Sequence, residues 1–115
     1  MTVKECYEAI GGSYDGVMSR LPSEALVKRF LLKFVNDKSF DELTAALEAE
    51  NVEDAFRAAH TLKGVCGNLS LDKLGASSIA ITEELRAGNL EAAKPMYPEV
   101  AANYKMTVDA INQIS

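Results

Sequence analysis

The sequence predicts an all-α fold, and three observations support this prediction. Apolar residues recur at three- and four-residue steps along most of the chain, which is the spacing of an amphipathic helix. No stretch shows sustained alternation of apolar and polar residues between hairpin turns, so strands are not expected. The connections between the expected helices are short, which favours antiparallel neighbours. We therefore expect a bundle of helices.

Capping and breaking residues divide the first third of the chain into three expected helices. A short helix fits residues 2–10, because Gly11-Gly12 interrupts the pattern behind it, and a second fits residues 14–20. Pro22-Ser23 then opens a longer helix at 24–35, since proline is favoured at the start of a helix. The apolar face of this helix is expected to contain Leu26, Phe30, Leu31, Phe34 and Val35.

The middle of the chain is expected to contain two further helices. Ser39 and Glu42 have the spacing of a capping box, so a helix is expected at residues 40–47. Asn51 is a candidate N-cap for the next helix, which is expected to end where residues 68–70 interrupt it.

The last part of the chain continues the helical pattern. One helix is expected to end at Gly88, and its apolar residues are Leu71, Leu74, Ile79, Ile81 and Leu85. The pattern resumes at residue 89 and continues to about residue 114. Pro95 and Pro98 are expected to kink or break this element near its start, because each lacks a backbone donor.

Size and composition limit what the protein can do. With 115 residues we expect a single domain, residues 1–115. The net charge of −5 gives no electrostatic footprint for nucleic acid and would be repelled by an anionic membrane surface. No apolar run approaches the roughly 20 residues of a membrane span, and the N-terminus lacks the apolar core of a secretion signal.

The two cysteines, Cys6 and Cys66, are far apart in sequence and form no metal-like pair, so no metal site is expected. We expect a reduced, cytoplasmic protein. Nothing in the sequence requires dimerisation, and we expect a monomer. The initiating Met1 leads us to expect a chain that stands alone.

The most informative segment surrounds His60, the only histidine. On a wheel at about 100° per residue, His60 falls about 120° from the centre of the expected core stripe and faces solvent or the rim of the bundle. That stripe contains Val52, Ala55, Ala59, Leu62 and Cys66. Gly64 and Gly67 follow His60 at i+4 and i+7, on its own face. Because each interior glycine costs a helix about 1 kcal/mol, we interpret them as space for another protein beside the imidazole.

Three further side chains flank His60 on this helix. Lys63 at i+3 can bring an ammonium group toward an anion on the ring, and Arg57 at i−3 flanks the other side. Phe56 at i−4 is the apolar candidate for contact with a partner. Each feature also has a plainer explanation. The glycines could serve close helix packing, Gly67 could mark the helix end with Asn68 as its left-handed cap, Arg57 could pair with Glu53 or Asp54, and Phe56 could be buried.

Residues 59–64, Ala-His-Thr-Leu-Lys-Gly, followed by Asn68-Leu69, resemble the signature of the histidine-containing phosphotransfer (HPt) domains of multistep phosphorelays. This resemblance implies an up-and-down antiparallel four-helix bundle with additional short N-terminal helices. It makes His60 the phosphoacceptor, with Lys63 steadying the phosphoryl oxygens and Gly64 admitting the partner. Ser70 departs from the family pattern, which often has glycine just after the motif helix.

The resemblance leaves open which polar residue of the neighbouring helix supports His60. Thr82 and Glu83 lie in the region where some family members place such a residue, but neither can be aligned securely.

The function implied is that of a phosphorelay intermediate. His60 would accept a phosphoryl group from a receiver-domain aspartate, or from a kinase, and pass it to the aspartate of another response regulator. The expected partners are receiver domains and a sensor or hybrid histidine kinase. No cofactor is expected on this chain, because the receiver would supply the divalent metal. The sequence contains no glycine-rich phosphate loop or kinase motif set, so we expect no autonomous ATP-dependent kinase activity.

Two other functions compete with the relay. An enzyme that uses His60 as a general base would need partner groups, and the nearest acidic residue on that face is Glu53, two turns away. The stronger alternative is a pseudo-HPt protein, a helical adaptor that binds receiver domains and is never phosphorylated on His60.

Overall fold

The computed structural model describes residues 1–115 and consists of helices and their connections, without a strand. The all-α prediction is therefore confirmed. In chain order the elements are α1 (Val3–Ile10), α2 (Tyr14–Arg20), α3 (Glu24–Val35), α4 (Ser39–Glu48), α5 (Val52–Leu69), α6 (Asp72–Arg86), α7 (Leu90–Ala93), the 3₁₀-helix η1 (Lys94–Met96) and α8 (Tyr97–Ile111).

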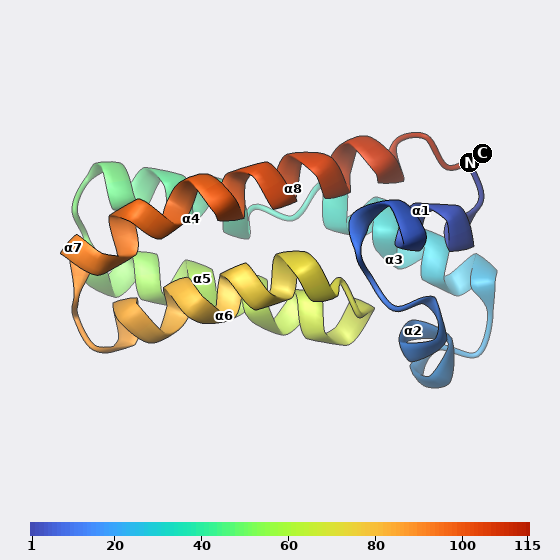
Figure 1. Ribbon diagram of the computed structural model, residues 1–115, viewed down its shortest axis with the longest axis horizontal. Helices are drawn as coiled ribbons and strands as arrows, with labels where there is room; N and C mark the ends of the chain where they lie inside the picture. The colour runs from blue at the N-terminus through green and yellow to red at the C-terminus, as the bar shows by residue number, and fades with distance from the viewer.

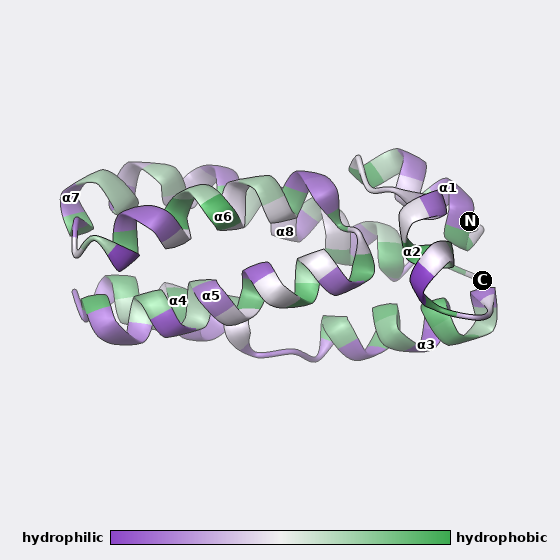
Figure 2. Cartoon of the chain, turned by 90° about the horizontal axis from the view of Figure 1, so that it is seen from below, coloured by the Kyte–Doolittle hydropathy of each residue, from purple (hydrophilic) through white to green (hydrophobic).

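The longer helices run along the 40 Å axis of the molecule (Figure 1). α5 packs against α4 on one side and α6 on the other, and α6 packs in turn against α8. α4 and α8 meet through stacked aromatic rings, with the centroid of Phe40 5.8 Å from that of Tyr97 and 4.1 Å from that of Tyr104. Figure 2 shows hydrophobic and hydrophilic bands alternating along each helix, as expected for amphipathic helices.

The first three helices gather at one end of the molecule, where the two chain termini also meet (Figure 1). The backbone N–H of Ser115 donates a hydrogen bond of 3.0 Å to the carbonyl of Met1. The buried residues of α1, including Tyr7, belong to the same hydrophobic cluster as those of α5.

Several helices begin at the caps that the sequence suggests, but one expected cap is wrong. The side chain of Asn51 accepts the backbone N–H of Asp54 at 3.0 Å and caps α5 as expected. Ser39 and Glu42 do not form a capping box. Ser39 is instead the buried first residue of α4, and its backbone N–H donates to the Asp37 carboxylate at 2.8 Å. The N-cap position of α4 is occupied by Lys38, whose side chain makes no capping bond.

The apolar face of α3 also differs from the expected one. Its buried residues are Val27, Leu31 and Phe34, whereas Phe30 is 37% exposed. Leu26 and Val35, which were expected on the same face, are only partly buried. Apolar residues lie on almost every side of this helix, so periodicity alone could not separate the core face from its neighbour. On α6, Leu74, Ile81 and Leu85 are buried, whereas Ile79 is 49% exposed.

Of two expected helix boundaries, the break near the prolines is present and the end of α5 is displaced. The expected break near Pro95 is present as η1, and Pro98 lies in the first turn of α8. The end of α5 lies further along than expected, because Asn68 is still helical and the helix ends at Leu69. Ser70, not Asn68, adopts the left-handed conformation, with φ of 54°.

A methyl group at Gly12 is expected to destabilise the fold, because this glycine allows the chain to approach two rigid groups. A Cβ atom there would lie 2.8 Å from Cδ2 of Tyr7 and 2.9 Å from the carbonyl oxygen of Ser70. Gly12→Ala should lower the free energy of unfolding by about 1–3 kcal/mol, measured by urea denaturation. The matched control is Gly64→Ala, where an added Cβ meets nothing within 4 Å and should raise that free energy by about 1 kcal/mol. Equal effects of the two substitutions would contradict this prediction.

Candidate functional site

His60 lies near the middle of α5, and its side chain is exposed as the helical wheel predicts. The opposite face of the helix is buried and contains Ala55, Ala58, Ala59, Leu62, Cys66 and Leu69. Helix α5 begins at an Asn51 cap and carries Glu53 and Asp54 in its first turn, where acidic groups interact favourably with the helix dipole. The small alanines toward the core allow α4 and α6 to pack closely against α5.

Gly64 and Gly67 are exposed on the same side of α5 as His60. A Cβ atom added at either position would meet no atom within 4 Å. Close packing against another helix of this chain therefore does not explain these glycines. Gly67 does not mark the helix end either, because α5 continues through Leu69. The two glycines leave an open strip of backbone beside the imidazole.

A stack of three side chains joins His60 to the neighbouring helix. The Phe56 and His60 rings have centroids 5.7 Å apart and planes inclined by 26°. The guanidinium carbon of Arg86, at the end of α6, lies 5.0 Å from the centroid of Phe56, within the range of a cation–π contact. Phe56 is half-buried and packs against the core, so part of its surface remains exposed.

Arg86 was not identified from the sequence. Its only local signal is its position three residues after Glu83, with which it forms an exposed ion pair of 3.6 Å. Its approach to Phe56 depends on the antiparallel register of α5 and α6, which the sequence alone does not specify.

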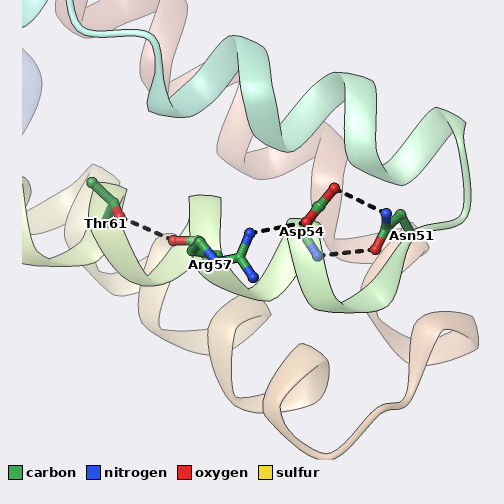
Figure 3. Close-up of polar contacts among 4 residues, drawn as sticks. All are labelled: Asn51, Asp54, Arg57 and Thr61. Carbon is green, nitrogen blue, oxygen red and sulfur yellow. Dashed lines mark hydrogen bonds and ion pairs between the residues drawn. The ribbon is translucent and has the colours of Figure 1, made fainter.

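The two flanking cations differ in their surroundings. Lys63 is partly buried on α5 and takes part in no hydrogen bond or ion pair within the chain, so its ammonium group is free to move. Arg57 instead donates to the Asp54 carboxylate at 3.0 Å, and Asp54 in turn interacts with Asn51 (Figure 3). Of the two roles expected for Arg57, a free cation beside His60 or a partner of a nearby acidic residue, the structure shows the second. The Arg57 side chain is 74% exposed, so water screens this ion pair and it contributes little to stability.

Neither polar candidate on α6 interacts with His60. Thr82 is fully buried, and its hydroxyl donates to the carbonyl of Ser78 at 2.6 Å, one turn earlier in the same helix. Glu83 is exposed and faces Arg86. Among the residues of α6, Arg86 is therefore the one that a chain of contacts joins to the His60 ring, through Phe56.

Cys66 lies on the buried face of α5, and burial raises the pKa of its thiol to about 12. Such a thiol stays protonated near neutral pH and is a poor nucleophile, in agreement with the interpretation of Cys66 as a core residue. The structure brings together no three histidine, cysteine or acidic side chains that could hold a metal ion. None of the helices combines the length and the apolar character that crossing a membrane requires.

A family model described as "Hpt domain" matches residues 35–113, more than half of the chain, including all of α5 and α6. The comparison with curated proteins gives no match, and neither does the comparison with solved structures.

Proposed function

This chain belongs to the Hpt domain family, and from this premise we propose that it carries a phosphoryl group on His60. Hpt domains take part in phosphorelay signalling, in which they interact with receiver domains and histidine kinases. The observation that most supports His60 is its exposure on a helix face that Gly64 and Gly67 leave open. A phosphoacceptor must be reached by the active site of a second protein, and this face offers that access.

The proposed chemistry is a nucleophilic substitution at phosphorus. A neutral imidazole nitrogen of His60 attacks the aspartyl phosphate of a receiver, a P–N bond forms, and the bond from phosphorus to the aspartate oxygen breaks. The aspartate leaves as a carboxylate. The same steps in reverse pass the group to a second receiver. In each transfer, the receiver that takes part would supply the divalent metal. Lys63 has no partner in the chain and is proposed to steady the phosphoryl oxygens.

Docking is proposed to use the face of α5 around His60. Gly64 and Gly67 admit the backbone of the partner, and the exposed surface of Phe56 provides an apolar contact. Arg57 lies beside this face and can exchange its exposed Asp54 partner for an acidic group of the receiver. A small surface of this kind binds transiently, as a shuttle between two partners requires.

We also propose the finer features that the family implies for the fold. α4, α5, α6 and α8 would form the up-and-down four-helix bundle, supported by their mutual packing, and α1 and α2 would be the additional N-terminal helices. Residues 1–115 would form a single domain that acts as a monomer in the cytoplasm. The chain would need no cofactor of its own.

The test is transfer of radioactive phosphate from a phosphorylated receiver domain to the purified chain. We expect label on the chain that is lost in acid and retained in alkali, which is the behaviour of a phosphoramidate and not of a phosphoester. ATP alone should give no label, because the sequence has no kinase motif set. Receivers that bind the chain without labelling it would contradict the proposal and favour the pseudo-HPt adaptor.

A further inference from the structure

The C-terminal turn of α5 is held by an arginine from α2, outside the residues that match the family model. Nη1 of Arg20 donates to the carbonyl of Gly67 at 2.6 Å and to the hydroxyl of Ser70 at 2.7 Å. The last carbonyls of a helix lack the usual donor four residues later, and the carbonyl of Gly67 accepts a long bond of 3.4 Å from the backbone N–H of Ser70. A charged donor such as Arg20 forms the stronger hydrogen bond to it. Arg20 therefore joins the last turn of α5 to the residue that ends it.

Other groups of the N-terminal segment reach the same turn. The buried hydroxyl of Tyr7 donates to the carbonyl of Leu69 at 2.7 Å, and the backbone N–H of Ser13 donates to the carbonyl of Ser70 at 2.9 Å. Gly16 permits the approach of α2, since a Cβ atom there would lie 2.9 Å from Oγ of Ser70. Residues 7–20 thus cap the helix that carries His60.

These contacts stabilise Ser70 in a strained backbone conformation. Its φ of 54° lies in the left-handed region, which costs a residue other than glycine about 1–2 kcal/mol. Ser70 is nevertheless buried, and both its hydroxyl and its carbonyl are bound by the N-terminal segment. The backbone N–H groups of Ser70 and Leu71 also close this turn, through bonds of 3.4 and 2.9 Å to the carbonyls of Gly67 and Cys66. The bonds from the N-terminal segment add to this closure, and without them the last turn of α5 would fray more readily.

The turn that Arg20 holds is continuous with the face around His60. Gly67, whose carbonyl Arg20 binds, lies two turns from His60 on the same open strip. Arg20 also lines a cleft of about 450 Å³ between α2, α3 and the C-terminal part of α5, together with Val65 and Asn68. A change in the conformation of this turn would therefore change the shape of the proposed docking face.

We propose that Arg20 is a positioning residue for phosphotransfer, which holds the C-terminal turn of α5 in the geometry on which a receiver domain docks. This inference rests on the proposed role of His60. Arg20 acts through Gly67 and Ser70 and does not touch the reacting atoms. If the turn frays, only a fraction of the molecules presents the docking geometry, and the apparent affinity for the receiver falls by that fraction.

The test compares Arg20→Met with Arg20→Lys, at a temperature at which thermal denaturation shows each variant to be folded. The initial rate of transfer is measured against the concentration of the phosphorylated receiver. For Arg20→Met we expect the half-saturating concentration to rise about threefold to tenfold, with little change in the maximal rate. A rise of this size corresponds to the loss of a partly exposed, charged hydrogen bond. Arg20→Lys keeps one charged donor and should restore part of the affinity. The matched control is Arg29→Met, on an exposed side chain of α3 that makes no hydrogen bond within the chain.

Amide hydrogen exchange gives a second measurement that does not depend on activity. In Arg20→Met the amides of residues 67–71 should exchange faster, while those around His60 should exchange as in the wild type. The positioning role would be overturned if Arg20→Met kept the half-saturating receiver concentration of the wild type, or if Arg29→Met raised it equally. Label on the wild-type chain would show in either case that the relay function itself stands. A wild-type chain that takes no label would overturn the relay function, and the positioning role with it.

Discussion

His60→Gln is expected to abolish transfer of a phosphoryl group to the chain and to leave the fold intact. A glutamine amide has no nucleophilic lone pair comparable to that of an imidazole nitrogen, so no P–N bond can form. The fold should tolerate the change, because the His60 side chain is exposed and stacks only on the half-buried ring of Phe56. Label transfer from a phosphorylated receiver measures the first effect, and thermal denaturation measures the second.

The control for this variant is Thr61→Ala, on the next residue of α5. Thr61 is exposed and its hydroxyl donates to the carbonyl of Arg57 at 3.0 Å (Figure 3), so its loss also changes an exposed side chain of the same helix. Thr61→Ala should be labelled like the wild type. Label on His60→Gln at the wild-type level would place the phosphate on another residue and refute the assignment.

Gly64→Leu is expected to separate stability from function more sharply than any other single change in this chain. A leucine side chain at this position would project into open space beside the imidazole, where the partner must approach. A displacement of about 1 Å between reacting groups can cost a rate on the order of 100-fold, and we expect a loss of transfer of at least this size. The free energy of unfolding should rise by about 0.5–1 kcal/mol, because leucine favours a helix more than glycine does.

The matched control for Gly64→Leu is Ala102→Leu, which adds apolar bulk to an exposed position of α8. This control should keep both the rate of transfer and the affinity for the receiver. Transfer at the wild-type rate by Gly64→Leu would show that the open strip on α5 is not the docking face, whatever its effect on stability.

The sequence predicted the features that depend on neighbouring residues in the chain. The Asn51 cap and the exposure of His60 follow from local spacing, and both are present. Predictions of features that depend on tertiary contacts were wrong, and some of these features were not predicted at all. Ser39 is the buried first residue of α4 and not its cap, and the core face of α3 was shifted because several of its faces are apolar.

The site shows the same division between local and tertiary information. Gly64 and Gly67 could be placed beside His60 from the helical repeat alone, and the structure places them there. Arg86 and Arg20 could not be found in this way, because each reaches α5 from a helix whose register against α5 is set by packing. The left-handed conformation of Ser70 was also missed, since serine has no strong preference for it.

The hydrogen bond between Ser115 and Met1 has a consequence for the way this unit can be combined with other proteins. Because the two ends of the chain lie side by side, a host protein could receive it within a single surface loop, without long linkers to span the insertion. The same geometry suits circular permutation, in which the present ends are joined and new ends are opened in an exposed connection. Most of α5, the helix that carries the exposed His60, lies away from both ends (Figure 1), so His60 would stay accessible in either arrangement.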